Sequence, residues 1–271
     1  MGLTDRRRTA AVCSLVAVLV ALVGACGAPD KDTQDDEQLS GAPSSEGGPD
    51  VRGAELYLSF DDPQVGFDGS PEYADAQGGP FAGRVVTAND GTAQPVPGAA
   101  GRGQALAFPS RCTAASGCPR AMVEVPADPA LQPEDRPFAY GASVRLASDQ
   151  TSVGSNIVQS GRFESVGGQW KLQVDGDEGQ PSCIIRSGGD DPVKVRSSVS
   201  IADDAWHRIV CRRDEAGISI EVDGSVHRRP ADTGSVDSGL AVRIGSPGIG
   251  DHDDQFHGVI DDVFLDIAPE E

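Results

Sequence analysis

Two short runs of alternating apolar residues, joined by a turn, constrain the fold of this chain most. His207, Ile209 and Cys211 alternate in the first run, and the second run begins at Ile218 and continues in the same way through Ile220 and Val222. Residues 215–217 separate the runs, and Asp223-Gly224 ends the second one with a pair that tolerates positive φ. A period of two residues is typical of half-buried strands, so we predict a β-hairpin here.

The same period recurs along most of the chain. Leu56, Leu58 and Phe60 alternate near its start, and no helical period is sustained after the N-terminus. Glycine (34 residues) and proline (19) are abundant, which favours many short strands joined by turns. Besides the hairpin and this first strand, we expect strands within residues 121–126, 137–146, 156–161, 169–176, 182–186, 192–196, 240–245 and 256–265.

The hairpin resembles the laminin G-like module, in its Trp206-His207-x-Ile209-x-x-Arg212 run and its Ile218-x-Ile220-x-Val222-Asp223-Gly224 run. The segments at residues 98–108 and 256–263 are similar to other motifs of that family, in the expected order. The resemblance implies an all-β, two-sheet antiparallel jelly-roll sandwich of the concanavalin A-like type. It covers residues 54–268 as one domain.

The first 25 residues are interpreted as a lipoprotein signal peptide. Arg6, Arg7 and Arg8 precede an apolar run at residues 10–23, which is short for a transmembrane span. Val23-Gly24-Ala25-Cys26 resembles the bacterial lipobox, which implies that Cys26 carries the lipid. We therefore expect an extracytoplasmic protein that is anchored to the cell membrane by its N-terminal lipid.

Residues 26–53 are expected to form a disordered acidic linker, because Asp, Glu, Gly, Pro and Ser dominate them and little could be buried. The whole chain has a formal net charge of −20. Such a charge argues against nucleic acids and anionic lipid surfaces as partners. Cations, basic proteins and neutral glycans remain possible partners.

Four cysteines remain once Cys13 is assigned to the signal peptide and Cys26 to the lipid. Four cysteines allow three pairings, of which we favour Cys112–Cys118 and Cys183–Cys211. A zinc site is the competing interpretation, but the spacings contain no paired CxxC units and an exported protein folds in an oxidising compartment.

Catalytic patterns are missing from the sequence. The chain has neither the Glu-x-Asp-x-x-Glu run of many concanavalin A-like glucanases nor an HExxH or G-x-S-x-G motif. His207 is interpreted as a hydrogen-bonded structural histidine rather than a base. Trp206 is assigned to the core, and Trp170 is the weak candidate for stacking on a sugar ring.

A structural calcium ion is predicted between the first and last strands. Asp261 alternates with Val263 and Leu265, so its carboxylate should point toward the core, where it needs a partner. Asp62 follows the first strand, and related jelly rolls often bind calcium between these strands. Calcium prefers carboxylate and carbonyl oxygens. The proposed ligands are Asp62 and Asp261, with Asp61 and Asp75 as less certain contributors.

These features together predict a lipid-anchored binding module whose ligand is a glycan or an envelope protein. A divergent glycoside hydrolase or lyase of the same fold is one alternative, and a structural envelope module is another. Two carboxyl groups about 5–10 Å apart in an aromatic-lined cleft would favour the enzyme. A hollow with exposed aromatic residues and no such pair would favour sugar binding.

Overall fold

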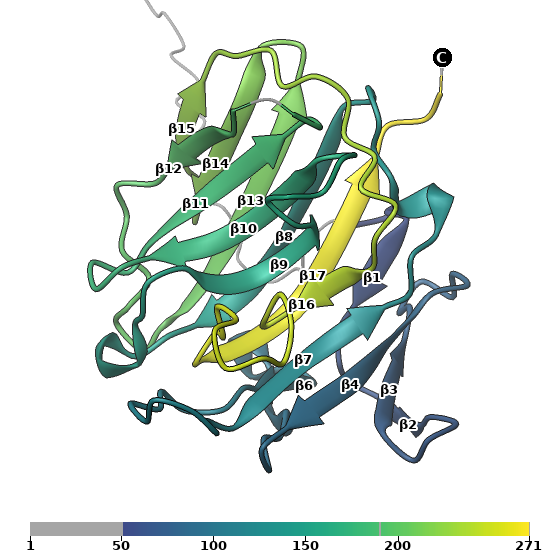
Figure 1. The fold of residues 1–271 in the computed structure, drawn as a ribbon. Helices are drawn as coiled ribbons and strands as arrows, with labels where there is room; N and C mark the ends of the chain where they lie inside the picture. The colour runs from purple at the N-terminus through teal and green to yellow at the C-terminus, as the bar shows by residue number, and fades with distance from the viewer. Residues whose placement is uncertain (1–50, 190, 271) are drawn as a thin grey trace, which may run out of the picture. The chain divides into compact units, whose positions relative to one another are not determined.

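The structure, a computed structural model, describes residues 51–189 and 191–270, which form two antiparallel β-sheets packed face to face (Figure 1). This confirms the predicted all-β sandwich. The predicted signal peptide, Cys26 and most of the predicted linker lie outside the described residues. None of the helices among the described residues could span a membrane.

The first sheet contains eight strands in the order β15-β14-β13-β8-β17-β6-β5, with β1 paired to β17. First and last strands are therefore neighbours, as the sequence predicted. The bounds are β1 Leu56–Leu58, β5 Gln94–Pro97, β6 Gln104–Ala107, β8 Phe138–Arg145, β13 Trp206–Asp214, β14 Gly217–Val222, β15 Ser225–Arg229 and β17 Val259–Ile267.

The second sheet contains nine strands in the order β12-β11-β10-β9-β16-β7-β4-β3-β2. It faces the viewer in Figure 1. Its strands are β2 Pro63–Val65, β3 Pro71–Ala74, β4 Ala82–Ala88, β7 Arg120–Val125, β9 Ser155–Gly161, β10 Gln169–Asp175, β11 Gln180–Arg186, β12 Val193–Arg196 and β16 Val242–Ile244. The helices are single 3-10 turns at Ala99–Gly101, Pro129–Leu131 and Ser148–Gln150.

The predicted hairpin is strands β13 and β14. Ile209 lies opposite Val222 and Cys211 opposite Ile220, and these side chains belong to the core between the sheets. The turn after β14 has positive φ at Asp223 (49°) and Gly224 (84°), which suits this residue pair in a two-residue hairpin loop. Local pattern and tertiary packing agree at this hairpin.

The four cysteines of the domain are paired as predicted. Cys112 and Cys118 form one disulfide, with their Cα atoms 5.8 Å apart, and Cys183 and Cys211 form the other, at 5.7 Å. Cys183 lies on β11 and Cys211 on β13, so the second disulfide joins the two sheets through the core.

The structure contradicts the predicted roles of both tryptophans. Trp170 is fully buried, and its ring lies 4.7 Å from that of Tyr140, so no sugar can stack on it. Its neighbours Leu172 and Val174 share its face of β10 because side chains alternate along a strand. Trp206 is only partly buried, with the Arg145 guanidinium 5.6 Å from its ring centroid. The assignments of Trp170 to a ligand site and of Trp206 to the core are therefore wrong.

A bulge in β17 corrects the predicted direction of Asp261. The pairing of β17 with β8 shifts between Asp261 and Phe264, and Asp262 adopts a φ of 50°. Ile260 and Val263 both belong to the main core because the extra residue resets the alternation. Asp261 is buried, with 4% exposure, but it does not share the core face of Val263 as predicted.

Candidate functional site

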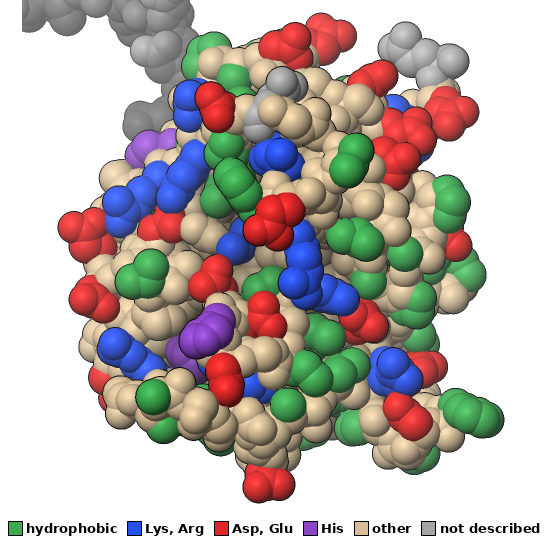
Figure 2. All heavy atoms as spheres, in the orientation of Figure 1, with side chains coloured by type: hydrophobic (Ala, Val, Ile, Leu, Met, Phe, Trp, Pro, Cys, Tyr) green, Lys and Arg blue, Asp and Glu red, His purple; other side chains and the backbone are tan. Residues whose placement is uncertain are grey.

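A continuous row of polar side chains crosses the outer face of the nine-stranded sheet. Cross-strand pairing brings Arg243 of β16 beside Gln159 of β9, and Gln159 beside Lys171 of β10. Lys171 in turn lies beside Ile184 of β11. Basic and acidic side chains gather together over this face in Figure 2. A hollow of about 510 Å³ opens over the row, and we call it the β9–β11 hollow.

The β9–β11 hollow has strands as its floor and two loops as its walls. Gln159, Gln169, Lys171 and Ile184 come from β9, β10 and β11. The loop after β9 and the loop between β16 and β17 supply the walls, and Pro192 completes the lining. The wall residues are Arg162, Phe163, Glu164, Pro247, Asp253 and Asp254.

Lys171 is the central charged group of the floor. Its side chain is only 11% exposed, and its Nζ lies 3.4 Å from the Asp254 Oδ2 atom, a long contact for an ion pair. Burial lowers the pKa of Lys171, and the nearby Asp254 carboxylate opposes that shift only in part. The ammonium therefore retains hydrogen-bonding capacity for a ligand in the hollow.

Gln159 supplies an acceptor beside this donor. The residue is 2% exposed, and its Nε2 atom donates to the Gly161 carbonyl at 2.7 Å. Its Oε1 atom has no hydrogen-bond partner among the described residues. A buried carbonyl oxygen without a partner costs free energy. The Oε1 atom is itself covered, so a ligand hydroxyl reaches it only when the Gln159 side chain turns its amide into the hollow, and the new bond would then offset that cost.

Phe163 gives the rim an aromatic surface. Its side chain is 62% exposed, and the Arg186 guanidinium lies 5.1 Å from the ring centroid. Ile184 adds apolar surface from the floor. A few convergent polar groups beside apolar surface are the usual composition of a small-molecule site.

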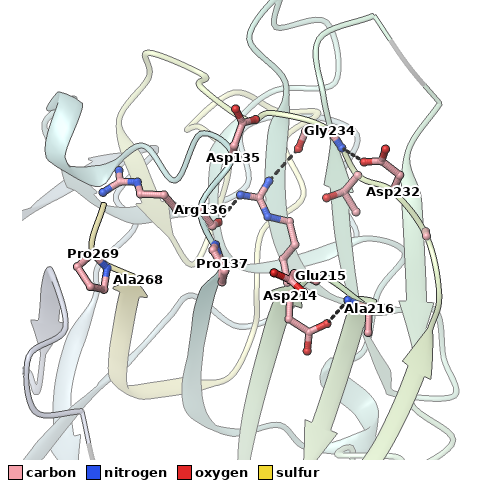
Figure 3. A pocket seen from close by; sticks show the side chains of 13 residues that line it. Asp135, Arg136, Pro137, Asp214, Glu215, Ala216, Asp232, Gly234, Ala268 and Pro269 are labelled. Atoms are coloured by element: carbon pink, nitrogen blue, oxygen red, sulfur yellow. Dashed lines mark hydrogen bonds between the residues drawn. The ribbon is translucent and has the colours of Figure 1, made fainter. Parts of the chain in front are cut away.

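A larger hollow, of about 850 Å³, lies between the loops that follow β13 and precede β8 (Figure 3). Arg213 is buried in it and donates to the carbonyls of Glu134, Arg136 and Gly234. Asp214 accepts from the backbone of Ala216, and Asp232 from that of Gly234, as Figure 3 shows. These groups already hold the loops together, so the hollow offers less to a ligand than the β9–β11 hollow.

The residues predicted to bind calcium are only partly brought together. Asp261 accepts from Ala99 and Asp61 accepts from Gln104, each at 2.8 Å, so both carboxylates hold the β5–β6 connection. Burial and nearby acidic groups, including Asp61, raise the pKa of Asp261 to about 7.

Two of the predicted ligands lie elsewhere. Asp62 is exposed, whereas Asp75 accepts from the backbone of Tyr57 and Gln77. Within residues 51–189 and 191–270, no group of three or more acidic, His or Cys side chains is placed to hold a metal ion. A calcium ion at Asp61 and Asp261 would therefore depend largely on backbone carbonyls and water, and it stays a prediction.

His207 has the structural role that the sequence indicated. Its Nδ1 atom lies 2.6 Å from Asp223, and its Nε2 atom lies 2.9 Å from Asp203. Burial lowers the pKa of His207, but the two hydrogen bonds outweigh burial and raise it above its usual value. The side chain joins the segment before β13 to the turn after β14 rather than facing a cleft.

Sequence reasoning missed the residues of the β9–β11 hollow. Lys171 could have been found. It follows Trp170 directly on a predicted strand, so if the tryptophan is assigned to the core, the lysine must point outward. It is also one of only three lysines in the chain, with Lys31 and Lys194. Asp254 and Phe163 could not have been found, because they lie in loops whose position depends on the fold.

Comparisons with known proteins agree with this fold. A family model described as the concanavalin A-like lectin/glucanases superfamily matches residues 121–265, more than half of the chain. None of the curated proteins matches the chain.

Several solved structures share the fold at low sequence identity. The binding domain of Paraclostridial mosquitocidal protein 1 is 10% identical with a TM-score of 0.55, over 81% of this chain and 50% of that one. Botulinum neurotoxin type C, whose cell entry depends on two ganglioside molecules, is 13% identical with a TM-score of 0.51, over 81% and 49%. The serotype C1 binding domain is 11% identical with a TM-score of 0.52, over 80% and 49%. This chain thus spans about half the length of each.

Proposed function

Because the chain belongs to the concanavalin A-like lectin/glucanase superfamily, we propose that it is a binding module that recognises a neutral glycan in the β9–β11 hollow. One observation carries the proposal: a nearly buried ammonium, that of Lys171, and an unpartnered amide oxygen, that of Gln159, share a single hollow. A sugar hydroxyl can accept from the first, and it can donate to the second once the Gln159 side chain turns its amide into the hollow. Phe163 offers an aromatic surface to the apolar face of a sugar ring.

The charge of the lining favours a neutral ligand. Arg162 and Lys171 are opposed by Glu164, Asp253 and Asp254, and the whole chain carries −20. A polyanionic glycan would meet repulsion from this surface. The ganglioside-dependent neurotoxin that shares the fold supports a glycan as the ligand class, whereas the neutral charge is argued from this chain's own lining, because gangliosides are anionic.

We propose binding without catalysis. A glycosidase needs two carboxyl groups that face the bond to be cleaved. In the β9–β11 hollow, Asp253 accepts from the backbone of Gly250 at 2.7 Å, and Asp254 contacts Lys171. Two of the three lining carboxylates are thus engaged in holding the walls, and Glu164 alone does not make the pair that a glycosidase needs. Anchoring of the module at the cell membrane through Cys26 remains part of the proposal.

A glycan array probed with the full chain tests the proposed function, with variants Lys171→Met and Gln159→Leu. Each removes a polar group at similar volume, so we expect affinity for the bound glycan to fall about tenfold, the effect of one lost hydrogen bond. Lys194→Met is the matched control, because Lys194 lies on the neighbouring β12 but pairs with Asp175 at 2.7 Å and does not line the hollow. Equal loss in all three variants, or none in the first two, would refute the site.

A further inference from the structure

One wall of the β9–β11 hollow is a loop rather than a strand. Residues 247–254, between β16 and β17, supply Pro247, Asp253 and Asp254 to the lining, and we call them the 247–254 wall. The wall is folded on itself, because Gly250 donates to the Asp253 carboxylate at 2.7 Å and Asp253 donates back to the Gly250 carbonyl at 3.1 Å. Such a turn moves as a unit, so its attachments to the rest of the domain decide where Asp254 lies.

Arg120 is a buried side chain that attaches this wall to β7. It begins β7 and is 8% exposed, and its guanidinium donates to the carbonyl of Asp253 at 2.7 Å and to that of Asp251 at 2.5 Å. Burying a guanidinium is costly unless its donors are used, and here two of them hold the backbone of the wall. Both bonds go to the wall and neither goes to the floor of the hollow, so the contribution of Arg120 is to position the wall.

The Cys112–Cys118 disulfide closes a second segment that contacts the same wall. The loop that it closes includes Gly117, whose N–H donates to the Asp251 carboxylate at 2.9 Å. Residues 113–117 are all exposed, so little burial orders them. The disulfide restricts this loop, and without it the entropy cost of holding Gly117 against Asp251 would rise.

We propose that Arg120 and the Cys112–Cys118 disulfide are positioning elements that set the place of Asp254 opposite Lys171, and thereby the ligand affinity of the β9–β11 hollow. The Asp254–Lys171 contact, at 3.4 Å, is where the wall meets the floor. Asp254 does not belong to a strand, but its backbone carbonyl accepts from the backbone N–H of Asn156 in β9 at 3.0 Å. Affinity thus depends on residues that do not touch the ligand. The affinity part of this inference rests on the proposed function, whereas the placement of Asp254 does not.

Lys171 reports the position of the wall without any ligand. The charged groups that face it are Asp254 and Asp175, which raise its pKa, and Lys194, which lowers it. If the wall moves away, Lys171 loses part of the burial that lowers its pKa and also the interaction with Asp254 that raises it, so the pKa departs from its value in the unaltered chain. A mere loss of global stability would not change this value in the folded state.

The test is an NMR titration of the full chain labelled with ¹³Cε-lysine. The chain contains only three lysines, so Lys171→Met assigns the signal of Lys171. We expect the pKa of Lys171 to change in Arg120→Gln and in the double variant Cys112→Ser/Cys118→Ser, and to stay the same in the control variant. Arg84→Gln is the matched control, because Arg84 lies on the same sheet face in β4 but pairs with Asp68 at 2.9 Å, away from the wall. Glycan affinity should fall about tenfold in the same two variants and not in the control.

An unchanged Lys171 pKa in folded Arg120→Gln would overturn the inference, even if glycan binding is found. A changed pKa in a chain that binds no glycan would instead refute the proposed function and leave the positioning role intact. If Arg120→Gln does not fold, mild reduction of the unaltered chain replaces it. The Cys112–Cys118 disulfide lies in an exposed loop, while Cys183 and Cys211 are at most 1% exposed, so the first opens before the second.

Discussion

At the scale of single residues, the direction of a side chain decides its role. Trp170 and Lys171 are neighbours on β10, yet one fills the core and the other faces the β9–β11 hollow. A strand turns each successive side chain to the opposite face, so the two residues cannot both be available to a ligand. The aromatic residue that does reach the hollow, Phe163, lies in a loop after β9.

His207 should make stability depend on pH. Its pKa is raised in the folded chain by Asp203 and Asp223, so its stabilising contribution is complete below the usual histidine pKa of about 6.5. That contribution is lost as pH rises through the folded-state pKa. We expect the free energy of unfolding to fall more between pH 6 and 9 in the unaltered chain than in His207→Gln. Urea titrations at a series of pH values measure this, with exposed His252→Gln as control; parallel profiles would contradict it.

At the scale of elements, the bulge in β17 changes what its acidic residues do. It places Val263 and Ile260 in the core and directs Asp262 to the Tyr57 hydroxyl, which donates to it at 2.5 Å. Asp261 is left to the β5–β6 connection, where Asp61 also lies. Two carboxylates thus share one loop, at the place where β1 and β17 adjoin.

The predicted calcium ion belongs to this pair of strands. A metal that binds only the folded chain raises stability by about 2.7 kcal/mol at a hundredfold excess over its Kd. We expect added calcium to raise the melting temperature of EDTA-treated chain and to have less effect on Asp261→Asn. Asp75→Asn serves as a control, because Asp75 bonds to Tyr57 and Gln77 instead. If calcium shifts neither chain, Asp61 and Asp261 serve only to hold the backbone amides of that loop.

At the scale of the whole molecule, the two sheets are joined both by their core and by the Cys183–Cys211 disulfide. Closing a loop by a disulfide is worth about 3–4 kcal/mol on the entropy model. The hollow lies on the outer face of one sheet, so ligand binding there leaves the core undisturbed. A rigid sandwich that presents a shallow site suits a tethered binding module.

The N-terminal sequence predicts how the module is tethered. Cys26 lies outside the described residues, and the prediction that it is lipidated depends on Val23-Gly24-Ala25-Cys26 alone. Since two or more acyl chains anchor a protein stably, Cys26→Ala should move the protein from the membrane fraction to the soluble fraction or leave it unprocessed. Mass spectrometry and detergent partitioning measure both results, with Cys13→Ala as control. Identical mass and partitioning of Cys26→Ala and the unaltered chain would exclude this anchor.

The sheet sandwich and its two disulfides could be predicted from the amino-acid sequence. Alternation in β13 and β14, the turn at Asp223-Gly224 and the four cysteines are local signals, and the structure follows all of them. Such signals predict the structure correctly because burial of one strand face and the conformational freedom of a turn residue depend on only a few adjacent residues.

The β9–β11 hollow, in contrast, could not be predicted from the sequence, because it forms only when the domain folds. Gln159, Lys171 and Asp254 are up to 95 positions apart in the sequence, and sheet pairing together with the anchoring of the 247–254 wall brings them into one hollow. The bulge that turns Asp261 away from the core is likewise invisible in the alternation of its neighbours. Both depend on which strands become neighbours, and that choice is made by the packing of the whole domain rather than by any segment of it.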